Sequence, residues 1–349
     1  MPNGITTTVH DQANEHLDFI EEEYNVTVVV AVAHGSHAWG LSNADSDYDI
    51  KAVYVPDSLH QYAQLGSHDE TITRDFDEFE IEAWDIQKFG ELLVQSNDQA
   101  LDVLRSPIAY RERFDRDELR EFIEENYSPI ALYHKYRSIS KNNYRKYLSH
   151  HLASNRKDTY PILERWDREN LNGYLVRNEH TGKDMFVPDR VIDNDKDEFL
   201  HMDFEDVDTT EDDHRYCPNC DRQPDQLPVK FQTTNTRQTV KRNLAVTRAS
   251  MYAYYVKRTG ENGEHELPHV EFPAFLSEQA PDVFNEDVLD LAWELVEKKL
   301  DSDNSEIGDR VGHEFAHPPE DIDRDIHVSK PPEKDTLNSF IADILQNAE

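Results

Sequence analysis

The sequence predicts an α/β protein in which a mixed sheet flanked by helices is followed by a mainly helical region. The continuous β-branched run over residues 26–32 is typical of a buried strand. Residues 48–55 and 79–84 alternate apolar and polar side chains, as half-buried strands do. From about residue 114 onward, apolar residues recur at helical spacing instead.

The same patterns place the elements in order. Gly35-Ser36 breaks the first strand and Pro56 ends the second. Helical spacing predicts helices over 9–23, 85–95, 116–125, 129–152, 236–258 and 284–300. A short amphipathic helix ends the sequence, and we expect its apolar stripe to dock back onto the body; the stripe comprises Leu337, Phe340, Ile341, Ile344 and Leu345.

The length of 349 residues allows roughly two domains. We predict an α/β domain over 1–112, and a helical domain over 113–155 and 231–300. Residues 156–230 are polar and acidic, and are interpreted as an insertion, either a loop or a small subdomain. Residues 301–349 form a linker and the docking helix.

Acidic residues dominate the composition, with 72 Asp and Glu against 36 Lys and Arg and a net charge of -36. They are spread along the sequence rather than gathered in a tail, which favours adaptation to a high-salt cytoplasm. We expect the fold to loosen at low salt, as circular dichroism would show. Non-specific nucleic-acid binding is disfavoured, so any such contact needs a local basic patch. No signal peptide or membrane span is recognisable, and a cytoplasmic protein is expected.

The segment from His34 to Ile50 carries the most specific chemistry. Gly35, directly after a strand, lets the backbone approach a phosphate, and Ser36 adds a hydroxyl at the start of a short helix. Asp47 and Asp49 are two residues apart on a strand and face the same side. Two such carboxylates repel each other unless a divalent cation lies between them. The pattern predicts a magnesium site that leaves positions for substrate phosphates.

Two ions about 4 Å apart would activate a hydroxyl and stabilise leaving pyrophosphate, usually with a third carboxylate. Glu80 and Glu82, on the next strand, are the candidates for it. Asp-x-Asp alone is weak evidence in so acidic a sequence, because 75–77, 195–197 and 301–303 repeat it. The order of strand, Gly-Ser, polar spacer, Asp-x-Asp and apolar strand is what favours a nucleotide site.

The stretch GSHAWGLSNADSDYDIKAVYV, residues 35–55, resembles the nucleotidyltransferase signature of the DNA polymerase beta superfamily. It is most similar to the branch associated with RNA ligases and RNA repair. The resemblance extends to residues 80–104, to the helical blocks 137–148 and 241–260, and to residues 267–276, about two-thirds of the sequence in all. It implies a polymerase-beta-like mixed sheet with flanking helices, followed by a mainly helical domain.

The resemblance also implies roles for individual residues. Asp47, Asp49 and Glu80 would hold two Mg²⁺ or Mn²⁺ ions, with Glu82 as the alternative to Glu80. Gly35 and Ser36 would hold the phosphates of a nucleoside triphosphate such as ATP. Lys51, which replaces a common arginine, is a further nucleotide-binding candidate.

A basic helix stands out in the acidic sequence. Arg137, Lys141 and Arg145 are four residues apart and share one helix face, with Tyr144 available for stacking. We interpret Lys141 and Arg145 as nucleotide-binding residues; the alternative is that these cations neutralise neighbouring acids. Arg248 is a weaker candidate.

The sequence has two cysteines, in the segment His214-Arg215-Tyr216-Cys217-Pro218-Asn219-Cys220. Cys217 and Cys220, with His214, have the spacing of half a structural zinc site. A second pair is missing, and a plain reduced turn is the competing interpretation.

These features together predict an enzyme that transfers a nucleoside monophosphate from a nucleoside triphosphate to an acceptor hydroxyl and releases pyrophosphate. An RNA 3′ end is the first choice of acceptor, through the family resemblance alone. Nucleotidylation of a protein or a small molecule is the enzymatic alternative. A nucleotide-binding regulator without catalysis is the alternative from another class.

Overall fold

The computed structural model describes residues 5–63, 69–154, 159–168, 171–178, 183–192, 231–233, 237–327 and 331–348. The chain divides into two compact units. The first consists of Met1–Lys141, Leu244–Ser305 and Arg310–Glu349, and the second of Asn142–Asn243 and Glu306–Asp309. Among the described residues, no helix is both long and apolar enough to cross a membrane.

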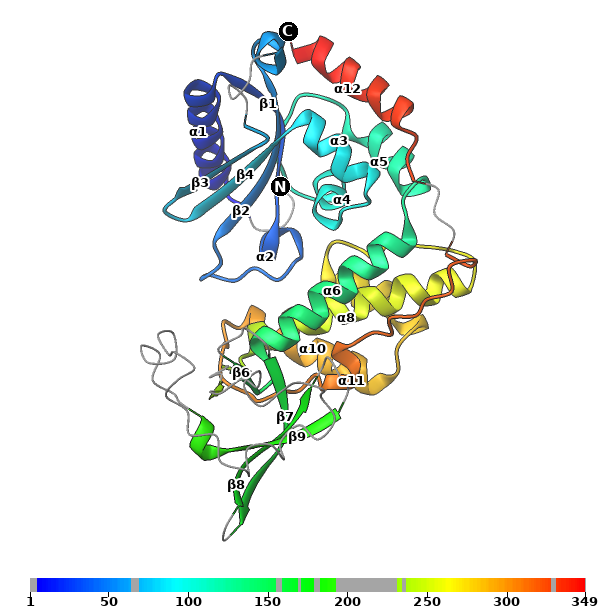
Figure 1. The fold of residues 1–349 in the computed structure, drawn as a ribbon. Helices are drawn as coiled ribbons and strands as arrows, with labels where there is room; N and C mark the ends of the chain where they lie inside the picture. Colours follow the sequence, from blue (N-terminus) through cyan, green and yellow to red (C-terminus); the bar gives the residue numbers. More distant parts are fainter. Residues whose placement is uncertain are drawn as a thin grey trace. The chain divides into compact units, whose positions relative to one another are not determined.

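A five-stranded sheet forms the centre of the N-terminal part of the first unit (Figure 1). Its order is β3-β4-β2-β1-β5. The strands are β1 (Val26–Ala33), β2 (Tyr48–Pro56), β3 (Thr71–Phe76), β4 (Phe79–Asp85) and β5 (Ala109–Glu112). Only the β2–β4 pairing among these is parallel, so the expected mixed sheet is confirmed.

Helices cover both faces of this sheet. Helix α1 (Thr7–Tyr24) lies on one side, and α3 (Ile86–Val94) and α4 (Asp98–Arg105) lie on the other (Figure 1). Leu17 and Ile20 of α1 are fully buried in one core with Ile50 and Ile81 from the two parallel strands. Burial of apolar surface stabilises the fold by roughly 25 cal/mol per Å². Because the apolar side chains of β2 and β4 must face this core, the alternate side chains of these strands lie on the opposite face.

Helices make up most of the first unit after α4, as the sequence predicted. They are α5 (Arg116–Glu125), α6 (Pro129–Tyr147), α8 (Val240–Glu261), α9 (Phe272–Glu278), α10 (Glu286–Leu300), α11 (His313–Ala316) and α12 (Lys334–Ala348). A short hydrogen bond of 2.6 Å between the buried Ser140 and Ser250 hydroxyls joins α6 to α8. The helix expected over 129–152 ends at Tyr147, and residues 151–154 are a strand instead.

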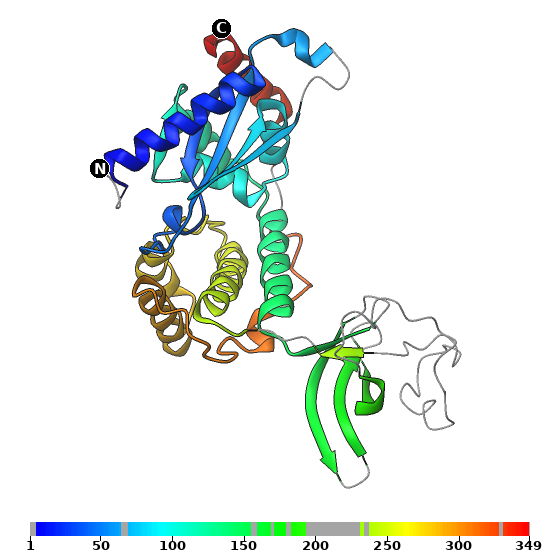
Figure 2. The ribbon, with the colours of Figure 1, turned by 90° about the vertical axis from the view of Figure 1, so that its left-hand side faces the viewer.

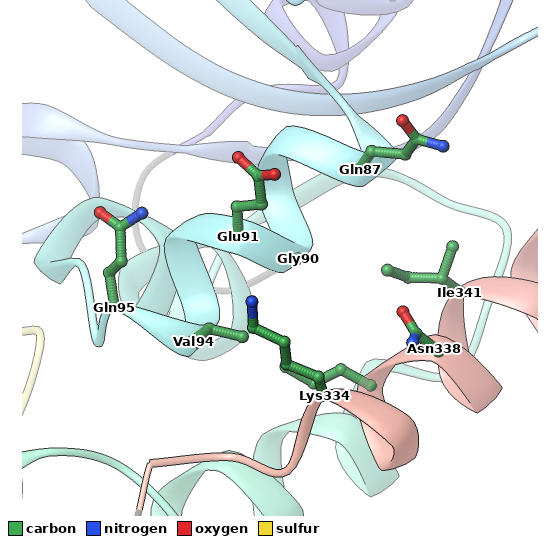
Figure 3. Close-up of a pocket in the computed structure, with 9 residues that line it drawn as sticks. Gln87, Gly90, Glu91, Val94, Gln95, Lys334, Asn338 and Ile341 are labelled. Carbon is green, nitrogen blue, oxygen red and sulfur yellow. The ribbon is translucent and has the colours of Figure 1, made fainter. Parts of the chain in front are cut away.

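The C-terminal helix α12 packs against α3. Ile341 lies over Gly90, where an added Cβ would come within 2.7 Å of the Ile341 Cδ1 atom. Phe340 contacts Phe122 of α5, with ring centroids 5.7 Å apart. An open groove of about 550 Å³ runs between α3 and α12, lined by Glu91 and Lys334 among others (Figure 3).

A second five-stranded sheet, with the order β10-β6-β7-β8-β9, forms the second unit. Its strands are β6 (His151–Ser154), β7 (Thr159–Arg168), β8 (Leu171–Asn178), β9 (Lys183–Pro188) and β10 (Phe231–Thr233). The antiparallel β7 and β8 curve side by side (Figure 2). The described part of the predicted insertion is therefore a small β subdomain rather than a loop.

Candidate active site

Gly35 and Asp49 are brought together where β1 and β2 meet. The His34 N–H donates a hydrogen bond of 2.8 Å to the Asp49 carbonyl oxygen, which fixes the turn that leads into α2 (Gly35–Ala38). Gly35 has φ of +59°, and a Cβ at this position would overlap the Asp49 carboxylate. Glycine is required here both by the backbone conformation and by the closeness of the carboxylate.

Three acidic side chains lie in a row across the sheet. The register pairs Asp49 of β2 with Glu80 of β4, and Glu80 with Asp75 of β3. Residues directly opposite each other in adjacent strands share one face, and these acids therefore point to the same side. Asp47 precedes β2 and is exposed. The sequence had suggested Asp75 only as a chance repeat of Asp-x-Asp, because the β3–β4 hairpin that aligns it was not predicted.

Glu82, the alternative third carboxylate, is engaged by other groups. Its carboxylate accepts hydrogen bonds of 2.6 Å from Lys51 Nζ and from Trp84 Nε1. Burial acts to raise the pKa of Glu82, but the hydrogen bond and charge of Lys51 outweigh it and lower that pKa. Glu80 is exposed and lies opposite Asp49, and this arrangement favours Glu80 over Glu82 as the partner of Asp49.

Lys51 is buried, with 7% of its surface exposed, and its ammonium lies 5.0 Å from the centre of the Trp84 ring. Its ammonium forms an ion pair with the Glu82 carboxylate on the adjacent strand β4. Lys51 would have to leave Glu82 before its ammonium could contact a phosphate directly. Its positive charge still lies on the same face as Asp49, two residues away on β2.

His34 is the residue immediately before α2, and its ring makes no capping hydrogen bond to the helix. Burial, followed by the positive charges of Lys51 and Arg248, lowers its pKa to about 3. The ring contacts Trp39 edge to face, with centroids 5.5 Å apart. At neutral pH, His34 is therefore an uncharged side chain beside the turn and not a cation that could bind phosphate.

Arg248 of α8 stacks on Trp39, with its guanidinium carbon 3.6 Å from the ring centre. Among the described residues, no carboxylate lies within ion-pair distance of Arg248, although the protein has twice as many acidic as basic residues. Nearby Asp102 of α4 has its pKa raised to about 6, first by burial and then by Asp98, with Arg248 opposing the shift. A half-buried arginine held by stacking is well placed to meet an anionic ligand.

Lys299 adds a cation that sequence reasoning missed. Asn43 Nδ2 donates a hydrogen bond of 2.7 Å to the Lys299 carbonyl oxygen, and Lys299 Nζ lies 3.4 Å from Ser46 Oγ. These contacts hold the loop before Asp47 against the end of α10. No local motif marks Lys299, because 253 residues separate it from Ser46.

The residues of the predicted basic helix differ in what they contact. Arg137 donates to the Pro318 carbonyl oxygen at 2.8 Å and pairs with Glu320 at 3.2 Å, and therefore anchors the C-terminal segment. Tyr144 is buried, with its hydroxyl bonded to Asp309 at 2.7 Å, so the stacking role expected for it is wrong. Lys141 and Arg145 are partly exposed on α6, and their nucleotide-binding role stays a prediction.

Metal-ligand geometry is only partly preformed. Within the part of the chain that the structure describes, no group of three or more His, Cys, Asp or Glu side chains is already arranged around a common ion position. The carboxylates of Asp49 and Glu80 are aligned by the sheet, whereas Asp47 lies outside the strand. His214, Cys217 and Cys220 lie outside the described residues, and structural zinc there stays a prediction.

Residues 9–164 match the family model RlaP, described as the RNA repair pathway DNA polymerase beta family. The resemblance seen in the sequence is confirmed over these residues, and the mixed sheet with its flanking helices is consistent with that fold. A curated relative from Bacillus subtilis (strain 168), the "Uncharacterized protein YcgL", is 33% identical over 153 residues. The alignment covers 43% of this chain and 59% of that protein.

Proposed function

We propose that the protein is a metal-dependent nucleotidyltransferase that joins a nucleoside monophosphate from a nucleoside triphosphate to an acceptor hydroxyl and releases pyrophosphate. The observation that carries the proposal is the parallel pairing of β2 with β4, which places Asp49 opposite Glu80 while Gly35 lies against the Asp49 carboxylate. A phosphate-approach glycine and two aligned carboxylates are what such a reaction needs in one place.

The donor set fits Mg²⁺ or Mn²⁺. Both ions prefer oxygen ligands, and Mg²⁺ is commonly held by one or two carboxylates together with substrate phosphates rather than by a complete protein cage. Asp49 and Glu80 would supply the fixed carboxylates, and Asp47 would join them from the preceding loop. The bound ions would supply charge neutralisation for the triphosphate and a lower pKa for the acceptor hydroxyl. An incompletely preformed site is therefore consistent with metal arriving with nucleotide.

The chain's own residues would position and neutralise the substrate. Gly35 allows the triphosphate to approach the backbone, and the Ser36 hydroxyl donates to a phosphate oxygen. Arg248 and Lys299 would balance phosphate charge, since both lie close to the 34–47 turn. Glu80, the exposed member of the aligned pair, would accept the proton from the acceptor hydroxyl.

An RNA 3′ end is the proposed acceptor. The matched family is described as belonging to an RNA repair pathway, and no feature of the site independently identifies RNA. Transfer to a protein or small-molecule hydroxyl remains the alternative. The net charge of -36 also leads us to propose that activity requires high salt.

A label-transfer assay tests the proposal. Purified protein in high-salt buffer with Mg²⁺ or Mn²⁺ receives each of the four α-labelled nucleoside triphosphates, with RNA ending in a 3′-hydroxyl or a 3′-phosphate. We expect label in RNA and equimolar pyrophosphate only with the 3′-hydroxyl acceptor. Label in protein would support the alternative acceptor. Nucleotide binding without pyrophosphate release, across acceptors and salts, would identify a non-catalytic regulator.

A further inference from the structure

Two neighbouring histidines, the buried His327 and the half-buried His265, lie away from the candidate active site. His327 has 1% of its surface exposed, and neither of its ring nitrogens has a hydrogen-bond partner among the described residues. The Nε2 atom of His265 is also buried, and it has no partner within the same described part of the chain. A buried polar atom without a partner destabilises the fold, so three of them together require an explanation.

Both rings are held against one point on α8. A Cβ on Gly260 would overlap the Cε1 and Nδ1 atoms of His327, and would lie 2.9 Å from His265 Cδ2. Only glycine leaves room for two imidazoles here. Gly260 therefore leaves the space in which both rings lie, although the two histidines are 62 positions apart (327 minus 265) in the sequence.

Independent contacts fix each histidine. The Tyr127 hydroxyl donates a hydrogen bond of 2.5 Å to the His265 carbonyl oxygen, and His265 itself has φ of +50°. The His327 N–H donates to the Asp323 carbonyl oxygen at 3.2 Å in the C-terminal segment. The meeting of the two rings is thus imposed by the backbone on both sides.

The separation of the rings permits both imidazoles to bind one metal ion. The centroids are 5.4 Å apart and the ring planes are inclined by 76°. Imidazole nitrogens bind Zn²⁺ at about 2.0–2.1 Å, and a tetrahedral angle then places two ring centroids about 5 Å apart. The pair His313 and His317 differs, because its rings are stacked at 3.9 Å and nearly parallel.

The surrounding charges also suit a cation. Burial, followed by the neighbouring His265 and Lys257, lowers the pKa of His327, while Glu261 and Asp323 oppose the shift. Glu261 and Asp323 contribute negative charge near the rings.

We propose that His265 and His327 form a binding site for a divalent transition metal, of which Zn²⁺ is the leading example, and that the metal joins the C-terminal segment to the segment that follows α8. Water would complete the coordination, since no third protein ligand is in place among the described residues. The site goes beyond the proposed nucleotidyl transfer and does not depend on it.

Cobalt binding provides the direct test, because tetrahedral Co²⁺ absorbs visible light. The titration uses a background with His313→Ala and His317→Ala, which removes the stacked pair, and with Cys217→Ser and Cys220→Ser, which removes the cysteines of the other predicted zinc site. Excess Mg²⁺ occupies carboxylate sites. We expect one Co²⁺ per chain with tetrahedral absorption. His265→Asn or His327→Asn in this background should weaken binding by roughly tenfold or more.

Thermal unfolding of the background protein gives a second readout that needs no substitution at the proposed ligands. Zn²⁺ should raise its Tm and a chelator should reverse the rise, because metal binds the folded state. The proposal is overturned if the background binds no Co²⁺ and its Tm ignores Zn²⁺. It is equally overturned if both asparagine variants bind Co²⁺ as the background does, and the two rings would then be paired only with each other.

Discussion

The two sheets of this protein differ in what they bury and in what they display. In the first, β1 is buried along almost its whole length, and one continuous core covers the face towards α1. In the second, six of the described residues form the buried core, among them the fully buried Leu152 and Val176. The acidic row Asp49–Glu80–Asp75 belongs to the first sheet alone. A well-packed sheet can hold repelling carboxylates in register, because the core on its other face supplies the stability.

The largest effect is expected from Asp49→Asn. Loss of one aligned carboxylate should lower label transfer by roughly 10³-fold or more while the circular dichroism spectrum stays unchanged. Asp290→Asn, an exposed acid on α10, is the matched control and should keep its activity. Equal activity of the two variants would mean that the acidic row takes no part in catalysis.

Gly35→Ala tests the contact between the turn and Asp49. The new Cβ overlaps the carboxylate, and we expect activity to fall by roughly 10²-fold, since displacement of a catalytic group by about 1 Å has that cost. Gly263→Ala is the control, because Gly263 also has positive φ, at +86°, but has no heavy atom within 4 Å of an added Cβ. If both alanines reduce activity alike, backbone strain rather than the Asp49 contact is responsible.

A matched pair of valines compares the two cores. Val28 in the first sheet and Val176 in the second are both fully buried. We expect Val28→Ala to destabilise by about 2–3 kcal/mol and Val176→Ala by about 1–2 kcal/mol, because the smaller core can collapse around the cavity. Hydrogen exchange should show faster exchange through the first sheet for Val28→Ala, and only in β7–β9 for Val176→Ala. Exchange that rises equally everywhere would show that the two cores unfold as one.

The last prediction concerns the pH dependence of stability. Because the pKa of His34 falls from 6.5 to about 3 on folding, the folded state binds fewer protons in that window. Its stabilising contribution is complete above pH 6.5 and is lost as the pH falls towards 3, by up to about 1.4 kcal/mol per pH unit. Between pH 6 and 4, the free energy of unfolding measured with urea should depend less on pH in His34→Gln than in the unsubstituted protein. The difference should be roughly one proton's contribution. An unchanged slope would mean that His34 is protonated in the fold.

The sequence predicted the first sheet well and the second poorly, for a physical reason. The β-branched run at 26–32 and the alternation at 79–84 record a strand with a defined buried face. Of residues 160–166, whose burial is described, only Tyr160 is buried. The sequence therefore carries little alternation, and the strand follows from pairing with 171–178.

Within the candidate site, local patterns identified Gly35 and Asp49 because their spacing is short and their chemistry is specific. Asp75 and Lys299 could not be found in this way. Asp75 joins the acidic row through hairpin register, and Lys299 reaches Ser46 only through tertiary packing. The roles proposed for Asp47, Asp49, Glu80 and Lys51 remain predictions.

Binding of Mn²⁺ together with a nucleoside triphosphate most directly tests the claim that Asp49 and Glu80 form the metal site. Electron paramagnetic resonance at high salt would count bound Mn²⁺ in the unsubstituted protein, in Asp49→Asn and in Asp290→Asn, with and without a non-hydrolysable triphosphate. The account predicts tight Mn²⁺ binding that requires the triphosphate, is kept by Asp290→Asn and is lost in Asp49→Asn. Triphosphate-dependent Mn²⁺ binding of equal strength in all three proteins would contradict it.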